Sequence, residues 1–353
     1  MRLALSEAQR AINHASPNPR VGCVLVRDGV LIGKGCTQPP GEPHAEVMAL
    51  RDVRSQGLDP AGATAYITLE PCCHFGRTPP CVDALIEARV ARVVAALEDP
   101  NPLVSGQGFA RLRQAGIEVR VGLLSAEATE LNLGFMKRMT LGLPWTRVKL
   151  AISLDGRTGL ADGRSKWITG DEARLDGHRY RARACAIATG VGTIRHDDPA
   201  LTVRGLEFDR PLRQPRRLVF DHLGVTPPAA KALAGGALLI LADRVPPGLP
   251  EHVETVHFPD GRGKIDFAAA FRWLGRQAIN ELHVEAGARL TGPLIEAGVV
   301  DEVLVYVAPK LLGPAAREMV TITSPDSMES VLRLDLVDVA RLGDDVRLLY
   351  RLP

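Results

Sequence analysis

His44-Ala45-Glu46 is followed along the chain by Pro71-Cys72-Cys73-His74-Phe75-Gly76-Arg77-Thr78-Pro79-Pro80-Cys81, and these two segments are the most informative part of the sequence. A catalytic zinc ion takes three protein ligands and leaves a fourth position for water. His44, Cys72 and Cys81 can supply these ligands, while Glu46 is placed to shuttle protons without ligating. The two segments therefore predict a catalytic zinc site.

The order His-x-Glu, then Pro-Cys and a further Cys, is shared by the zinc-dependent nucleobase deaminases. Both segments begin predicted helices, whose N-termini stabilise thiolates through unpaired N–H groups. Eight residues separate Cys72 from Cys81, where two are commoner, so the insert is typical of a subfamily. Two other interpretations stay open. The cysteines are buried small apolar side chains, or Cys73 or His74 completes a closed structural zinc site.

Strand and helix patterns alternate on both sides of these segments. Strands are predicted at 21–26 and 30–33, joined by an Asp28-Gly29 hairpin turn, and again at 64–69, 92–96 and 117–121. Helices are predicted near the N-terminus and at 44–55, 81–88, 109–114 and 126–139. Strands separated by helices indicate a largely parallel sheet that is covered on both faces.

Gly142-Leu143-Pro144 breaks the last of these helices, and we place a domain boundary there. The second half alternates again, with strands at 145–152, 184–190, 216–221, 236–242, 281–284 and 301–308, and helices at 171–183 and 289–298. No GxGxxG motif follows the first of these strands, which disfavours a standard Rossmann dinucleotide site. The organisation is two α/β domains in tandem.

Composition excludes several classes of protein. The 353 residues carry 43 basic and 41 acidic side chains, a formal charge of +2, which is too small for binding to nucleic acid or anionic lipid. Aromatic residues make up only 4 %, which argues against a base-stacking surface. Glu7 interrupts the N-terminal segment before an apolar run develops, so we expect no signal peptide. The longest apolar run, around 235–242, is too short to span a bilayer, and we expect a cytoplasmic protein.

Three segments of the first half, Pro17–Cys23, Gly41–Val47 and Glu70–Cys81, closely resemble the bifunctional riboflavin-biosynthesis deaminase–reductase family. The resemblance implies that His44, Cys72 and Cys81 bind zinc and that Glu46 is the proton donor. It also implies that Asn18, His74 and Arg77 contact the pyrimidine or its ribose phosphate. Without it, Asn18 fits a Pro-Asn-Pro turn and Arg77 a solvated loop cation. Many relatives carry histidine where this chain has Thr37, which cannot act as an imidazole.

The second half resembles the reductase part of the same family through Lys149–Gly156, Trp167–Thr169, Asp197–Arg204 and Val284–Gly287. The resemblance implies a dihydrofolate-reductase-like fold that uses NADPH. The residues expected to hold NADPH are Ala151, Trp167, Thr193, Asp197, Gly287, Ala288, Arg289, Leu290, Thr291, Gly292 and Pro293. Those expected to hold the substrate are Lys149, Ser165, Arg181, Leu201, Arg204 and Glu285. Two purely structural alternatives remain: Trp167 is a core residue, and Arg181 is one cation of a basic helix face.

Together these patterns predict an α/β chain with a cytidine-deaminase-like α/β/α domain at 1–144 and a dihydrofolate-reductase-like α/β domain at 145–353. The resemblance implies zinc-dependent deamination of a phosphorylated diaminopyrimidinone, followed by NADPH-dependent reduction of its ribosyl group to ribityl. The expected partner is this small molecule, with no nucleic acid and no membrane, and we expect a homo-oligomer. The alternative function is a nucleic-acid base deaminase with an appended binding domain, which would need basic or aromatic tracks beside the zinc site.

Overall fold

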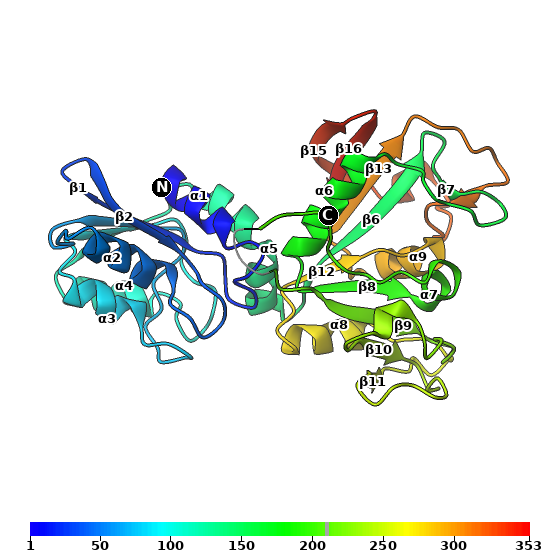
Figure 1. Ribbon diagram of the computed structural model, residues 1–353, viewed down its shortest axis with the longest axis horizontal. Coiled ribbons are helices and arrows are strands. Elements are labelled where there is room, and N and C mark those ends of the chain that lie inside the picture. Colours follow the sequence, from blue (N-terminus) through cyan, green and yellow to red (C-terminus); the bar gives the residue numbers. More distant parts are fainter. Residues whose placement is uncertain (209–211) are drawn as a thin grey trace. The chain divides into compact units, whose positions relative to one another are not determined.

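The computed structural model describes residues 1–208 and 212–353, which divide into two compact units, Met1–Gly142 and Leu143–Pro353 (Figure 1). We call them the N-terminal and the C-terminal unit. No helix among the described residues is long and apolar enough to cross a membrane.

The N-terminal unit is built on a five-stranded sheet in the order β2-β1-β3-β4-β5. Its strands are β1 (Gly22–Arg27), β2 (Val30–Cys36), β3 (Thr64–Ile67), β4 (Arg92–Ala95) and β5 (Glu118–Val121). Strands β3, β4 and β5 are parallel, but β1 is antiparallel to both of its neighbours. The expectation of a largely parallel sheet is therefore wrong here, because the hairpin turn at Asp28-Gly29 reverses β2 and places β1 against β3.

The helices of this unit are α1 (Arg2–Arg10), α2 (Ala45–Ser55), α3 (Cys81–Glu87), α4 (Gln107–Gln114) and α5 (Ser125–Leu141). Helix α2 packs closely on β2 because the strand presents glycine to it. A Cβ atom on Gly35 would lie 2.5 Å from the backbone nitrogen of Ala49, and one on Gly33 would lie 2.6 Å from its oxygen. This close contact fixes the start of α2 and therefore the positions of His44 and Glu46.

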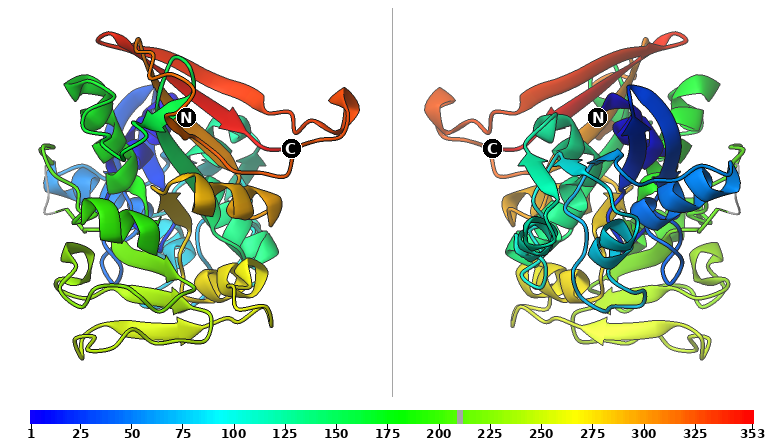
Figure 2. Two further views of the ribbon diagram at one scale, coloured as in Figure 1. Left: turned by 90° about the vertical axis from the view of Figure 1, so that its right-hand side faces the viewer. Right: turned by 90° about the vertical axis from the view of Figure 1, so that its left-hand side faces the viewer.

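The C-terminal unit contains a nine-stranded sheet in the order β11-β10-β9-β8-β12-β6-β13-β16-β15. The strands are parallel from β11 to β13, and β16 and β15 add an antiparallel hairpin at one edge, seen as a long ribbon in Figure 2. The bounds of these strands are β6 (Trp145–Ser153), β8 (Ala186–Gly190), β9 (Arg216–Asp221), β10 (Leu238–Leu241), β11 (Glu254–His257), β12 (Glu281–Val284), β13 (Glu302–Ala308), β15 (Asp335–Leu342) and β16 (Asp345–Arg351). A separate pair, β7 (Arg157–Gly159) and β14 (Arg317–Glu318), lies outside this sheet.

Alternate residues of the central strands face two different layers. Leu282 and Val284 of β12 belong to the large apolar core that includes α8 (Phe267–Arg276) and α9 (Ala288–Glu296). The other face is covered by α6 (Asp171–Arg183) and α7 (Val191–Asp197), and there Ile187 packs against Ile194. Covering on both faces explains the near-continuous apolar runs of these strands. It also makes any polar side chain on the central strands exceptional.

The sequence patterns missed several elements of this unit. Helices α7 and α8, strand β11 and the β15–β16 hairpin were not predicted. The hairpin was missed because its apolar side chains do not alternate cleanly, with Leu336, Val337 and Val339 all exposed. The fold class itself is confirmed: both units are α/β, as expected for the two domain types.

Candidate active sites

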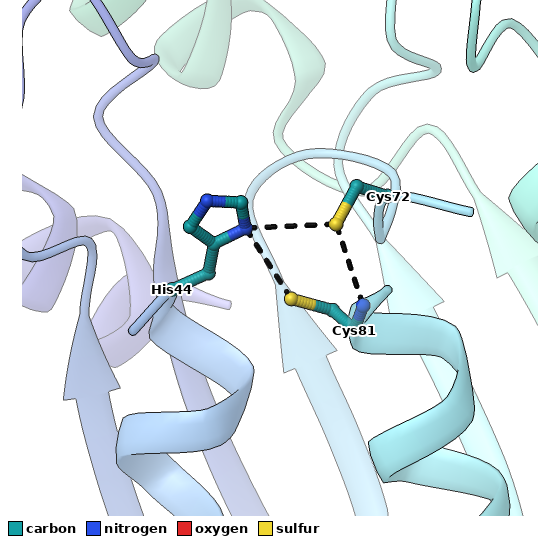
Figure 3. Close-up of side chains that lie close together, drawn as sticks. All are labelled: His44, Cys72 and Cys81. Carbon is teal, nitrogen blue, oxygen red and sulfur yellow. Dashed lines mark hydrogen bonds between the residues drawn. The ribbon is translucent and has the colours of Figure 1, made fainter. Parts of the chain in front are cut away.

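Three metal-ligating side chains meet at the N-termini of two helices in the N-terminal unit. His44 is the N-cap of α2, Cys81 is the first residue of α3, and Cys72 comes from the loop after β3 (Figure 3). The Nδ1 atom of His44 lies 3.5 Å from the sulfur of Cys72 and 3.4 Å from that of Cys81. The three ligand atoms all lie within 4.8 Å of one another. The cluster therefore has the size of a metal site.

The pKa values of the two cysteine thiols are shifted in opposite directions, as expected for a pair that needs a bound cation before both can ionise. The hydrogen bond with Cys81 lowers the pKa of the Cys72 thiol to about 4, and the backbone N–H of Cys81 also points at the Cys72 sulfur, 3.3 Å away. The same pairing, together with burial, raises the pKa of Cys81 well above its ordinary value. Both thiolates can form only when a positive charge lies between them. One imidazole and two thiolates are a donor set that suits zinc.

No fourth ligand completes this cluster among the described residues, where His44, Cys72 and Cys81 form the one candidate group of three or more. Cys73 packs partly against the apolar core, and its sulfur lies 3.8 Å from the carbonyl oxygen of Leu103. His74 lies beside the cluster in the wall of a cavity. This arrangement favours an open catalytic site over a closed structural one.

Glu46 lies in the first turn of α2 and is 3 % exposed. Burial raises the pKa of its carboxyl to about 7, and the neighbouring Cys72 sulfur adds to the shift. Such a carboxyl can both accept and release a proton near neutral pH. It lines the same cavity as His44 and Cys72, so a bound molecule there can reach all three.

The cavity has a volume of about 430 Å³ and collects the residues expected to bind the substrate. Asn18, His74 and Arg77 all line it. The segment that carries Asn18 is anchored by Asn132 of α5, whose side chain accepts the N–H of Arg20 and donates to its carbonyl oxygen. Thr37 also lines the cavity, but its hydroxyl accepts the N–H of Val21 and so has a structural partner.

Sequence patterns missed several groups of this cavity, namely Glu70, Thr78, Asp99, Asn101 and Arg138. Asp99 is a second buried carboxyl, and burial raises its pKa to about 7. Glu70 accepts backbone N–H groups from Asp99, Gly106 and Phe109, and so ties the loop after β4 to the Cys72 loop. The signal available was Asp99-Pro100-Asn101-Pro102 in the loop that follows β4, since polar residues beyond the carboxyl end of a parallel strand commonly face a ligand.

In the C-terminal unit, the expected residues lie on β6, in the segment between β7 and α6, on α6, on α7 and just after it, and from the end of β12 into α9. Arg181 of α6 forms a two-pronged ion pair with Glu285, with Nε–Oε1 at 2.5 Å and Nη2–Oε2 at 2.8 Å. It also donates to the carbonyl oxygen of Thr202, next to the buried Leu201. Lys149 of β6 interacts electrostatically with Glu285, and burial lowers the pKa of the lysine. The structure thus brings Lys149, Arg181, Leu201 and Glu285 together.

The expected NADPH-binding residues are spread more widely. Thr193 and Asp197 lie on α7, Gly287 is the N-cap of α9, and Leu290 contacts Gly190 at the start of α7. Within α9, Thr291 and Gly292 are buried, and a Cβ on Gly292 would lie 1.6 Å from the carbonyl oxygen of Thr321. These two residues therefore pack inward, whereas Gly287 and Arg289 are exposed.

Trp167 and its surroundings are more open. Trp167 is 60 % exposed, which rules out a core role, and the guanidinium of Arg174 lies 4.6 Å from its ring centroid. Ser165 is half-buried next to Gly159, and the backbone N–H of Arg204 donates to Nδ1 of His178 on α6. Ala151, half-buried, follows Lys149 on the same face of β6. Sequence patterns missed His178 and the buried His283 of β12.

Comparisons with known proteins match both units. Residues 144–348 match the family model of the RibD C-terminal domain, and residues 1–97 match that of the cytidine and deoxycytidylate deaminase zinc-binding region. The chain is 46 % identical to the riboflavin biosynthesis protein RibD of Escherichia coli, over 98 % of this chain and 96 % of that protein. It belongs to the RibD family.

Solved RibD structures agree with this assignment over the whole chain. An Acinetobacter baumannii RibD structure is 41 % identical, with a TM-score of 0.91 over 100 % of this chain and 97 % of that one. A Thermotoga maritima structure, described as a diaminohydroxyphosphoribosylaminopyrimidine deaminase/5-amino-6-(5-phosphoribosylamino)uracil reductase, is 32 % identical with a TM-score of 0.89 over the same shares. As a RibD family member, the chain is a bifunctional deaminase and reductase of riboflavin biosynthesis whose cofactors are zinc and NADPH. An appended nucleic-acid-binding domain is excluded, because the second half is the RibD reductase domain.

Proposed function

We propose that residues 1–144 deaminate 2,5-diamino-6-(5-phosphoribosylamino)pyrimidin-4-one by hydrolysis. Residues 145–353 then reduce the ribosyl group of the product to give 5-amino-6-(5-phosphoribitylamino)uracil. The observation that carries the proposal is the open His44, Cys72 and Cys81 cluster, with a buried carboxyl beside it in one cavity. The Thermotoga maritima relative is described by the same two activities.

In the deamination, His44, Cys72 and Cys81 hold the zinc, which when bound supplies a Lewis acid that makes water nucleophilic at neutral pH. Glu46 takes the proton that the attacking water loses and delivers it to the departing amine nitrogen, so that ammonia leaves. Its burial supports this role, because a carboxyl with a pKa of about 7 carries a proton in both directions.

Asn18, His74 and Arg77 bind the substrate in the same cavity. Asn18 and His74 offer hydrogen bonds to the pyrimidine, and Arg77 offers charge to the phosphate. Arg77 is exposed at the edge of the cavity, where a phosphorylated tail can remain hydrated while the ring reaches Glu46.

In the reduction, NADPH supplies the hydride, and the chain aligns the nicotinamide with the sugar. Arg181 and Arg204 bind the phosphate of the substrate, while Lys149 and Glu285 bind its sugar. Ser165 and Leu201 complete the substrate site. NADPH is held by Ala151, Trp167, Thr193, Asp197 and the segment from Gly287 to Pro293. Support comes from the meeting of these segments beyond the carboxyl ends of β6, β8 and β12, where parallel sheets bind ligands.

A cytoplasmic homo-oligomer is part of the proposal. The structure describes all six cysteines and joins none of them in a disulfide, which suits a reducing compartment. Among the described residues strand β15 lies at the edge of its sheet, next to β16, and it exposes Leu336 by 55 % and Val339 by 54 %. An apolar edge strand of this kind is normally covered by a partner. Light scattering of the purified chain measures the oligomeric state directly.

A complementation experiment tests the division of labour. Glu46→Gln should lose ammonia release and still reduce the deaminated intermediate, whereas Glu285→Gln should release ammonia and fail to reduce. Mixing the two variants with substrate and NADPH should restore the reduced product. If either variant lost both activities while keeping its zinc, the two activities would not belong to separate units.

A further inference from the structure

One face of the central strands in the C-terminal unit carries polar side chains where the rest of the sheet is apolar. On β12, Leu282 and Val284 face the large core, so Glu281, His283 and Glu285 point to the opposite face, toward α6. His283 pairs in register with Arg147 of β6 on one side and with Ile187 of β8 on the other. Histidine at the centre of a parallel sheet needs an explanation beyond packing.

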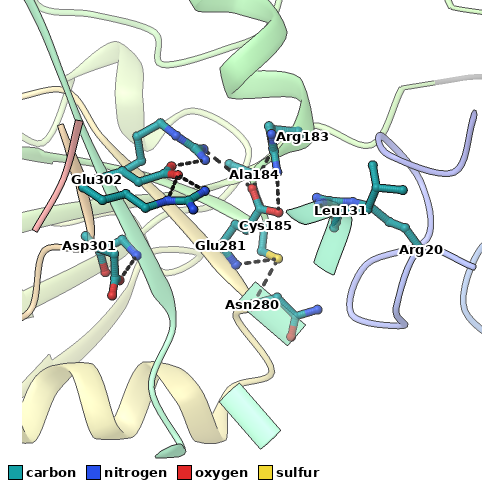
Figure 4. A network of polar contacts seen from close by, with 12 residues as sticks. Arg20, Leu131, Arg183, Ala184, Cys185, Asn280, Glu281, Asp301 and Glu302 are labelled. Atoms are coloured by element: carbon teal, nitrogen blue, oxygen red, sulfur yellow. Dashed lines mark hydrogen bonds and ion pairs between the residues drawn. The ribbon is translucent and has the colours of Figure 1, made fainter. Parts of the chain in front are cut away.

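The two ends of this polar row have different partners. Glu281 binds Arg183, with Nε–Oε2 at 2.8 Å, and Arg147 lies between Glu281 and Glu302 (Figure 4 shows Arg183, Glu281 and Glu302 in this network). These acidic and basic side chains pair with one another rather than with Glu285. Glu285, at the other end, faces Arg181 and Lys149. His283 stands between the two groups.

The ring of His283 faces the carboxylate of Glu285, and the guanidinium groups of Arg147 and Arg181 are close enough to act on it electrostatically. The Nε2 atom of the ring lies 3.3 Å from Oε1 of Glu285, and within residues 1–208 and 212–353 neither ring nitrogen has a partner at full hydrogen-bond geometry, so the donor of this buried ring is available to the carboxylate. The side chain is 0 % exposed, and burial lowers its pKa, so the ring is neutral and can donate a single proton. The tautomer with hydrogen on Nε2 places that donor on the carboxylate.

The backbone of Glu285 is held rigidly, whereas its carboxylate depends on its partners. Its N–H donates to the carbonyl oxygen of Ala188, and its own carbonyl oxygen accepts the hydroxyl of Thr189. The carboxylate itself is held by Arg181 from α6. A substrate phosphate that binds Arg181 competes for the same guanidinium, which leaves the carboxylate with the charge of Lys149 but without the two hydrogen bonds from Arg181 that orient it. A donor fixed in the sheet maintains that orientation.

We propose that His283 is a positioning residue of the reductase, whose neutral imidazole donates from Nε2 to Glu285 and keeps this carboxylate oriented toward the sugar. The proposal rests on the proposed role of Glu285 in substrate binding. It gives the buried histidine a function that a purely apolar side chain of equal volume could not fulfil.

The test compares His283→Leu, which removes the donor, with His283→Gln, whose side-chain amide can place an N–H near the position of Nε2. Reductase kcat in His283→Leu should fall by about tenfold, the worth of one hydrogen bond to a charged group, with the KM for NADPH unchanged. His283→Gln should recover most of the loss. Fluorescence-monitored urea unfolding of the same chains controls for folding, because all three tryptophans lie in the C-terminal unit, and Ile187→Val on the neighbouring strand controls for local repacking.

Two outcomes would overturn the proposal. Reductase turnover within twofold of wild type in His283→Leu would show that the contact does not matter. Equal losses in the leucine and glutamine variants would show that the ring only fills space. Glu285→Gln, measured in parallel, separates these outcomes from failure of the proposed function: if it reduces normally, then the assignment of Glu285 is wrong, whatever His283 does.

Discussion

Replacing Glu70 with glutamine should loosen the wall of the deaminase cavity without touching the zinc ligands. Glu70 is buried, and its Oε2 accepts the N–H groups of Asp99 at 3.1 Å and Gly106 at 2.9 Å, while Oε1 accepts that of Phe109 at 3.2 Å. A glutamine has one acceptor oxygen. If that oxygen still accepts the N–H groups of Asp99 and Gly106, the side-chain NH2 of the glutamine faces the N–H of Phe109. Two donors then face each other, and the buried N–H of Phe109 has no acceptor.

The magnitude follows from these three bonds. An orphaned buried N–H costs about 1–3 kcal/mol, and each of the other two bonds loses its charge assistance, for a total of about 3 kcal/mol in the local opening of this loop. Since 1.4 kcal/mol is a factor of ten, the amides of Asp99, Gly106 and Phe109 should exchange hydrogen about a hundredfold faster. Deaminase turnover should fall as well, because Asp99 and Asn101 line the cavity.

Hydrogen exchange measured by mass spectrometry on peptides spanning 98–109 reads this change directly. Glu98→Gln is the matched control, because it makes the same charge change in the same loop at an exposed site. It should leave exchange at the three amides unchanged. Unaltered protection of these amides in Glu70→Gln would refute the account of how this loop is held.

Two further predictions concern the metal and the pH. Removing zinc with a chelator should abolish ammonia release, leave reduction intact and expose two additional reactive thiols, Cys72 and Cys81; parallel loss of reduction would contradict this. For Glu285, burial alone would favour the neutral acid, but Arg181 holds the pKa of this carboxyl well below its ordinary value of 4.5. Its ionisation thus stabilises the fold above pH 4.5, and the benefit is lost as the pH falls. The stability advantage of wild type over Glu285→Gln should therefore shrink below pH 4.5. All three tryptophans lie in the C-terminal unit, so fluorescence-monitored urea unfolding reports it, and a constant difference from pH 7 to pH 3 would count against the ion pair.

The zinc cluster could be predicted from sequence because its ligands lie in short local motifs. Cys72 and Cys81 are close in the chain, His44 begins a predicted helix, and few other functions need these residue types in this order. The alternation of strands and helices likewise indicated two α/β units. The strands could be recognised because parallel strands buried on both faces form nearly continuous apolar runs in the sequence.

What sequence reasoning missed depends on contacts between distant segments. Glu70 meets Phe109 only because β3 and β4 are neighbours in the sheet, and nothing near Glu70 in the chain marks it as an anchor. Asp99 reads as an ordinary turn residue until the fold places it in the cavity wall. His283 lies in a strand of ordinary appearance, and its contact with Glu285 follows from the two-residue period of the strand rather than from any motif.

The most direct test of the two-activity account is the mass of the product made from the diaminopyrimidinone ribosylamino phosphate, with and without NADPH. The account predicts exchange of one amine for a carbonyl oxygen without NADPH, and a further gain of two hydrogens when NADPH is present. A zinc-loaded protein that leaves the mass unchanged in both cases, or that deaminates only when NADPH is added, would contradict it.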